Sequence, residues 1–202
     1  MKYLLKYNLA LLSLMAVLGS CREEPNYPDE PEINFKRVDV DYRKETNDQG
    51  TETGITTALI TMVVGFQDGD GNLGLNPLDF EPGTTDPDSQ APFNPGSPYE
   101  NNFVTDLYIK KPVPGNPTDS AFVRYEFPVQ GFDFSGRFQR LTTDDRVEPL
   151  EGEIKYTLTG ITSEFFNTGD ILKFQIYIYD RDTPVPNRSN IVETTPIKLN
   201  FN

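Results

Sequence analysis

Carboxylates and glycines alternate in one short segment of the chain, residues 68–74. This segment reads Asp68-Gly-Asp70-Gly-Asn72-Leu-Gly and directly follows an apolar stretch. Three oxygen-bearing side chains at alternate positions can turn toward one point where glycines let the backbone curl. Because Ca²⁺ binds about six to eight oxygen atoms, this spacing predicts a calcium site. Asp-Gly and Gly-Asn pairs also form ordinary turns, and a plain turn is the alternative interpretation.

The segment resembles the calcium loops of the D-x-D-x-N type that occur outside EF-hands. In an EF-hand register, Asn76 and Asp79 would occupy loop positions nine and twelve. The glycines do not fall where an EF-hand requires one, and strands rather than helices are expected on both sides. The resemblance therefore implies Ca²⁺ held by oxygen atoms, without a helix–loop–helix unit.

A second group of carboxylates follows an apolar stretch near the end of the chain. Tyr179-Asp-Arg-Asp182 precedes Asn187, Ser189 and Asn190. In an immunoglobulin-like sandwich, the connections after the second and the sixth strand emerge at the same end, where carboxylates would repel one another without a cation. We therefore expect Ca²⁺, or less favourably Mg²⁺, at this end. The alternative role for Arg181, beside this cluster, is that of an internal counter-charge. The predicted ligands are Asp68, Asp70, Asn72, Asp180 and Asp182.

Alternating apolar side chains predict the strands that position these loops. Seven runs rich in β-branched and aromatic residues are separated by clusters of Gly, Pro, Asn and Asp. The pattern predicts an all-β fold, a single antiparallel immunoglobulin-like β-sandwich of about seven strands. The alternation slips by one residue between Phe35 and Val38, which predicts a bulge or a strand that changes sheet. The runs are 33–42, 58–66, 103–109, 123–127, 154–158, 172–178 and 191–201.

The connection between the second and third runs, residues 68–102, is too long for a hairpin. Its latter part is polar and turn-forming, so we expect it to be either functional or disordered. Phe80, Phe93 and Tyr99 would either pin it to the sandwich or present a contact surface. The arginines at 124, 137, 140 and 146 are expected to be solvated on a sheet face or in a loop.

The residue types that are missing exclude several kinds of chemistry. The chain has no histidine and no tryptophan, and Cys21 is its only cysteine. Ser–His–Asp catalysis, Cys–His catalysis and His-ligated zinc are therefore excluded. Hydrolysis of sugars by two carboxylates remains an alternative, but no cleft-forming segment is evident. We predict a protein that is not an enzyme.

The single cysteine follows a short apolar leader. Lys2 and Lys6 precede an apolar run that ends in Leu18-Gly-Ser-Cys21. The run is about ten residues long, whereas a transmembrane helix needs about 20. The leader resembles a bacterial lipoprotein signal peptide, and its last four residues match the lipobox of that class. The resemblance implies cleavage of residues 1–20 and acylation of Cys21, whose acyl chains would anchor the protein stably in a membrane.

Residues 21–31 are acidic and Pro-rich, which predicts an extended tether in front of a single domain, residues 32–202. At ~3.1 Å per residue, this tether would hold the domain ~30 Å from the acyl chains. Without the two lysines of the leader, the 18 basic residues become 16 against 31 acidic ones, a formal net charge of −15. That charge argues against nucleic acid and anionic lipid as direct partners.

Together, these motifs resemble uncharacterised surface lipoproteins of the Bacteroidetes type. Besides the lipobox, the resemblance rests on Arg22-Glu-Glu24, on the segment 66–74 and on the segment 180–194. It implies an outer-membrane lipoprotein exposed at the cell surface. We predict a non-catalytic binding or structural module, braced by calcium, whose ligand is a glycan or a protein. The alternative is a carbohydrate-binding or carboxylate-based glycan-acting protein of a surface uptake system.

Overall fold

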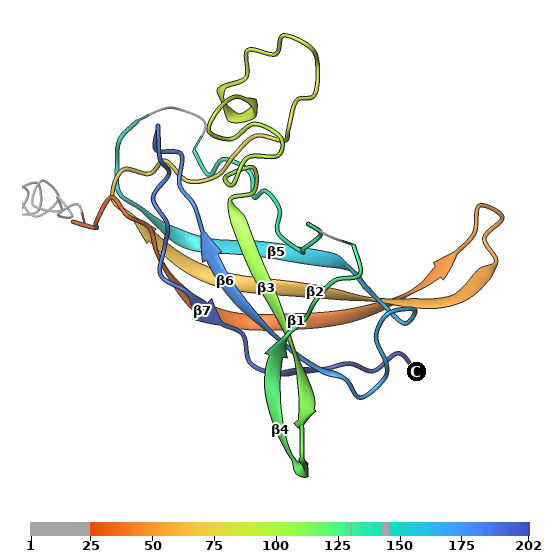
Figure 1. The fold of residues 1–202 in the computed structure, drawn as a ribbon. Helices are drawn as coiled ribbons and strands as arrows, with labels where there is room; N and C mark the ends of the chain where they lie inside the picture. Colours follow the sequence, from red (N-terminus) through yellow and green to blue (C-terminus); the bar gives the residue numbers. More distant parts are fainter. Residues whose placement is uncertain (1–24, 130, 143–145) are drawn as a thin grey trace, which may run out of the picture.

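The computed structural model describes residues 25–129, 131–142 and 146–202 and shows two antiparallel β-sheets that enclose one core (Figure 1). The first sheet has the strand order β1-β2-β5; the second has the order β4-β3-β6-β7, with β8 also paired to β6. No helix in this part of the chain is long and apolar enough to cross a membrane. The strands are β1 (Glu32–Thr46), β2 (Glu52–Asp68), β3 (Phe103–Val113), β4 (Asn116–Arg124), β5 (Leu150–Thr162), β6 (Ile171–Ile178), β7 (Val192–Glu193) and β8 (Ile197–Lys198).

This architecture confirms the predicted all-β, antiparallel sandwich. Strands one, two and five of the predicted runs share one sheet, and the third, sixth and last runs lie in the other. The more specific immunoglobulin-like assignment stays a prediction. The predicted signal peptide and the predicted acylation site, Cys21, lie outside the described residues.

The alternation slip in the first strand is a β-bulge. β1 pairs with β2 along its whole length, and the register shifts between Phe35 and Arg37, so that Lys36 has no partner residue across the pair. A bulge lets one strand keep its apolar side chains inward on both sides of an extra residue. The prediction of a bulge is therefore confirmed, and β1 does not change sheet.

Two runs end differently from the prediction. β4 spans Asn116–Arg124 rather than 123–127, because the chain leaves the sheet at Tyr125 and packs its aromatic side chains elsewhere. The last run forms two short strands, β7 and β8, on either side of Pro196. Proline has no N–H to donate to a sheet, so it interrupts the pairing there.

The core lies between the two sheets and holds the strand ends in place. Side chains of β2 such as Met62 face those of β6 such as Phe174, and both are fully buried. Phe103 of β3 stacks on Tyr156 of β5, with ring centroids 4.3 Å apart. Each fully buried apolar side chain of this size contributes about 1.5–3 kcal/mol. The ends of β2 and β6 are thus fixed by packing, and the loops that follow them start from defined positions.

Candidate cation site at the loop end of the sandwich

The two aspartate-rich segments meet where β2 and β6 end. Leu73, in the segment after β2, forms a β-bridge with Asp180, which follows β6. The side-chain amide of Asn72 donates a hydrogen bond to Asp182 across the same junction. The prediction that these two connections emerge at one end is confirmed.

Asp68 is the most unusual carboxylate of this junction. Its side chain has no exposed surface, and neither of its oxygens accepts a hydrogen bond of normal geometry. The backbone N–H groups of Asn72 and Gly71 favour its ionised form without reaching that geometry. A buried carboxylate without partners costs several kcal/mol when it is charged. The ionised form of Asp68 is therefore unfavourable unless a proton or a cation compensates its charge.

Asp180 is equally buried but well bonded. Its Oδ1 accepts hydrogen bonds from the backbone N–H groups of Asp182 at 3.0 Å and Asn187 at 2.7 Å. Its Oδ2 accepts one from the side-chain amide of Asn187 at 2.8 Å. All these donors are uncharged, so they orient the carboxylate but do not neutralise it.

Two amide groups bridge the remaining carboxylates. The Nδ2 of Asn72 donates to Asp70 at 2.6 Å and to Asp182 at 2.9 Å. The Nδ2 of Asn187 donates to Asp180 at 2.8 Å and to Asp182 at 3.0 Å. An amide N–H₂ between two carboxylate oxygens occupies the place that a cation would take, and a half-turn of the amide presents an oxygen instead.

The neighbouring carboxylates of this junction make one another's ionised forms less favourable. Burial raises the pKa of Asp68 to about 7, and the negative charges of Asp70 and Asp180 add to the rise. Burial likewise raises the pKa of Asp180 to about 6, and it raises the pKa of Asp70 above its ordinary value. The common cause is desolvation of several like charges at one point.

The described residues nevertheless include no group of three or more His, Cys, Asp or Glu side chains already arranged around a metal position. The predicted ligands lie together, but their oxygens do not point at one centre. Asn76 and Asp79, the continuation of an EF-hand register, do not join them. The backbone N–H of Asn76 is bonded to Asp88, and Asp79 accepts hydrogen bonds from Glu81 and Thr84.

The long connection after this segment is ordered by a second buried aspartate. Asp88 lies in a short 3₁₀ turn, η1 (Pro87–Ser89), and both its oxygens accept hydrogen bonds from Arg140, each at 2.7 Å. Burial alone would raise the pKa of Asp88, but the bonds from Arg140 and Asn76 hold it below its ordinary value. Sequence reasoning missed this pair because nothing in the spacing links the two residues.

The prediction that Arg137 and Arg140 are merely solvated is therefore wrong. The guanidinium of Arg137 donates to the backbone carbonyls of Asn76, Asp88, Phe93 and Glu100, with distances of 2.6–2.8 Å. Arginine suits this role because its five N–H groups form a rigid fork. The loop is thus tied to the domain, and Phe93 is buried beneath it while Phe80 is 75% exposed.

Arg181 also supports the first loop. Its guanidinium donates to the carbonyls of Leu73 and Gly74, both at 3.1 Å. It fixes the backbone that follows Asn72 and brings a positive charge close to the junction. The interpretation of Arg181 as an internal counter-charge stays a prediction.

The end of the tether packs on the same loop. The N–H of Gly69 donates to the carbonyl of Pro28 at 2.8 Å, and the hydroxyl of Tyr27 donates to Glu151 at 2.6 Å. A Cβ at Gly69 would lie 2.5 Å from the carbonyl oxygen of Tyr27, so only glycine allows this approach. Residues 27 and 28 are therefore part of the folded surface beside Asp68 and Asp70, which the composition of the tether did not reveal.

Comparison of the chain with models of protein families, with curated proteins and with solved structures gave no match. Four cavities of 260–390 Å³ lie on the described surface away from this site, because none of them is lined by Asp68, Asp70, Asp180 or Asp182.

Proposed function

We propose that this chain is a lipid-anchored surface protein whose β-sandwich is a non-catalytic binding or structural module braced by Ca²⁺. The lipobox-like Leu18-Gly-Ser-Cys21 supports export and acylation. The resemblance to Bacteroidetes-type surface lipoproteins supports a place on the outer membrane. The sandwich supports a module that presents surfaces rather than a deep catalytic cleft.

The observation that carries the calcium proposal is the unpartnered, fully buried carboxylate of Asp68. Folding keeps it next to Asp70 and Asp180, which makes its ionised form unfavourable unless positive charge enters. Ca²⁺ accepts carboxylate, amide and backbone oxygens in a flexible arrangement. The two bridging asparagines supply the amide oxygens once their side chains turn over.

The position of the site gives the cation a structural role. Asp68 and Asp70 flank Gly69, whose N–H holds the tether at Pro28. A cation at this point would stiffen the loop on which the tether rests and join it to the segment after β6. The brace would therefore lie where the membrane anchor enters the domain.

Calorimetric titration of the mature, acylated protein with CaCl₂ tests the proposal. We expect binding of Ca²⁺, weaker binding of Mg²⁺, and loss of the signal in Asp68→Asn. Asp48→Asn, in the exposed hairpin turn between β1 and β2, is the matched control and should bind as the wild type does. If neither cation gives a heat of binding, or if Asp68→Asn binds Ca²⁺ as the wild type does, the proposed calcium site is wrong.

The anchor is tested separately by mass spectrometry of protein isolated from membranes. The N-terminal peptide should begin at residue 21 and carry the mass of its acyl chains. A peptide that retains residues 1–20, with an unmodified cysteine, would overturn the surface assignment.

A further inference from the structure

The edge of the second sheet is open at one point beside β3. β4 pairs with β3 only as far as Arg124, and the N–H of Tyr125 makes one more bond, to Leu107. The chain then leaves the sheet and returns at Gly136, which exchanges two backbone hydrogen bonds with Phe103, of 2.9 and 3.0 Å. The stretch of β3 around Thr105 pairs with β6 on one side, but no described strand pairs with it on the other side.

Thr105 has an unpaired hydroxyl at this opening. Its backbone N–H donates to the hydroxyl of Ser135 at 3.1 Å, a side chain standing in for a missing strand. Its own Oγ1 has no hydrogen-bond partner, although the residue is only 2% exposed. A buried hydroxyl without a partner costs about 1–3 kcal/mol, unless a ligand or water supplies one.

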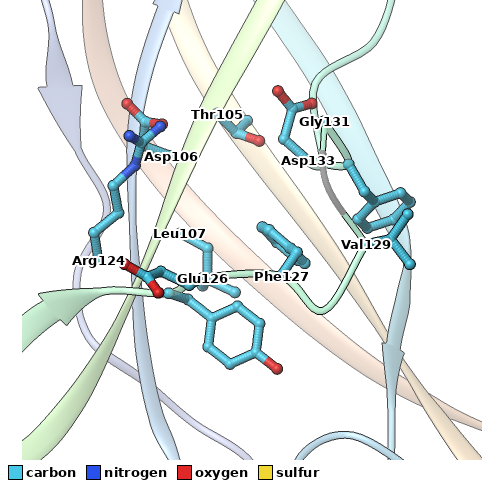
Figure 2. A pocket seen from close by; sticks show the side chains of 11 residues that line it. Thr105, Asp106, Leu107, Arg124, Glu126, Phe127, Val129, Gly131 and Asp133 are labelled. Carbon is cyan, nitrogen blue, oxygen red and sulfur yellow. The ribbon is translucent and has the colours of Figure 1, made fainter.

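A cavity of about 350 Å³, lined by Thr105 among other residues, lies at this opening (Figure 2). In this view the carboxylates of Asp106 and Asp133 lie on either side of Thr105, and Phe127 and Glu126 lie opposite them. Asp106 is ion-paired with Arg124 at the rim. The size falls within the range of small-molecule sites.

A second cavity, of about 390 Å³, adjoins the first. The two share Gly131 and Asp133, and the second continues over the outer face of the sheet to Tyr177. Its other polar side chains include Glu100, Asn101 and Ser135. We refer to these two adjoining cavities as the groove; aromatic side chains line both, with Phe127 in the first and Tyr177 in the second.

The aromatic side chains of the first cavity are held rigidly. The ring of Phe127 makes edge-on contacts with Tyr125 at 5.0 Å, Phe132 at 5.2 Å and Phe134 at 5.1 Å. Tyr125 packs in turn on Phe166, at 5.2 Å. Such a cluster needs little ordering when a ligand binds, which favours affinity.

The groups in the groove select one ligand chemistry. Hydroxyl and amide side chains donate and accept hydrogen bonds, while carboxylates accept and Arg124 donates, so the groove matches a ligand whose groups do both. Sugar hydroxyls do both, and sugar C–H faces pack on aromatic rings. Glu126 and Asp133, with Glu100 in the second cavity, make the groove acidic and oppose anionic ligands.

We propose that this groove, defined by Thr105, Glu126, Asp133 and Tyr177, binds a neutral oligosaccharide, with one ring in each cavity. The proposal names the ligand class of the binding module inferred above and rests on that binding role. It does not depend on the cation brace, whose carboxylates line neither cavity.

The test uses the mature protein with Ca²⁺ present and follows amide NMR signals during titration with neutral oligosaccharides of glucose, mannose, galactose and xylose. At least one should shift signals around Thr105 and Asp133 at millimolar concentration. Polygalacturonate, which is anionic, should not. If no neutral oligosaccharide shifts these signals, or if oligolysine does so instead, the proposal is overturned in favour of no ligand or a basic peptide.

Two variants locate the site. Thr105→Val removes the unpaired hydroxyl at almost constant volume, so it should melt at or above the wild-type temperature while weakening sugar binding at least tenfold. Glu126→Gln should weaken binding several-fold. Thr157→Val is the control, because Thr157 is exposed on the other sheet and bonds to Thr61. If both groove variants still bind sugar as the wild type does, the proposed sugar site is wrong. Both variants should bind Ca²⁺ as the wild type does, so a failure of the sugar site can be told apart from a failure of the calcium site.

Discussion

Two buried aspartates of this domain differ in whether the chain supplies their counter-charge. Asp68 and Asp88 are 0% and 1% exposed, and both lie in the long path between β2 and β3 or at its start. Asp88 accepts two hydrogen bonds from Arg140 and one from the backbone of Asn76. Asp68 accepts none, and the charges of Asp70 and Asp180 raise its pKa further.

The contrast distinguishes Asp88, whose carboxylate has a structural role within the chain, from Asp68, for which we propose a cation as partner. The chain supplies the counter-charge of Asp88 itself, so that residue can order a loop without any ligand. At Asp68 the chain supplies further negative charge, and the pKa values of the two residues move in opposite directions. The chain places Arg140 beside Asp88 but no hydrogen-bond donor of normal geometry at Asp68. This difference favours our proposal that a cation from solution binds at Asp68.

Breaking the Asp88 pair should have the largest effect on stability. We expect Asp88→Asn to lower the free energy of unfolding by about 3 kcal/mol, because it leaves Arg140 partly buried without its anion. For a domain of this size, that corresponds to a fall in Tm of roughly 6–12 °C. Urea unfolding of Asp88→Asn, Arg140→Ala and the double variant measures the coupling. A double variant whose loss equals the sum of the single losses would show that the pair is not coupled.

Calcium should have the next largest effect, and only through Asp68. At about one hundred times its Kd, a ligand that binds only the folded state adds about 2.7 kcal/mol, or roughly 5–10 °C in Tm. Melting in Ca²⁺ and in EDTA checks this for the wild type. Asp88→Asn should have a lower Tm in EDTA but the same rise in Tm with Ca²⁺. Asp68→Asn should lose this rise. If the wild-type Tm is the same in Ca²⁺ and in EDTA, Asp68 does not bind calcium and is protonated instead.

The meeting of the aspartate segments was predictable because it depends on strand order. Period-two alternation located the strands, and the topology of a sandwich then required the segments after β2 and β6 to share an end. The bulge at Lys36 was predictable for the same reason, since a slip in alternation has only a few structural causes.

The counter-charges and the groove were not predictable from the sequence. Arg140 reaches Asp88 only because the chain between them folds back over the sheet, and no periodicity describes that path. The opening at Thr105 exists because the chain leaves the sheet at Tyr125 and returns at Gly136. A threonine that alternates correctly in a strand gives no sign that its strand lacks a partner on one side at that point.

The pH dependence should separate the two aspartates once more. In the absence of divalent cations, folded Asp68 has a pKa of about 7 against its ordinary value of 3.8, so the folded state holds a proton that the unfolded state has lost. The contribution of Asp68 is complete below about pH 4 and disappears as the pH rises through 7, at up to about 1.36 kcal/mol per pH unit. Partial hydration during opening should limit the total to about 1–2 kcal/mol.

Urea unfolding between pH 4.5 and 7.5 in metal-free buffer measures this slope. Asp68→Asn should reduce the slope without abolishing it, because Asp180 titrates in the same direction with a pKa of about 6. Asp88, whose pKa is lowered, contributes stability that is lost only as the solution becomes more acidic than its ordinary pKa. A wild-type protein that gains stability throughout this range would contradict the raised pKa of Asp68.

The smallest effect should come from the contact that joins the Asp68 loop to the tether. In Gly69→Ala the new Cβ would lie 2.5 Å from the carbonyl oxygen of Tyr27 and 2.7 Å from that of Pro28, so the tether must move away. We expect a loss of about 1 kcal/mol, the value of one hydrogen bond, and faster hydrogen exchange at residue 69. Tyr27→Phe, which removes only the exposed bond to Glu151, should cost less. If Gly69→Ala also weakens Ca²⁺ binding while Tyr27→Phe does not, the close fit of the tether on the loop helps to hold the carboxylates together. That coupling has no counterpart at Asp88, whose partner comes from within the domain.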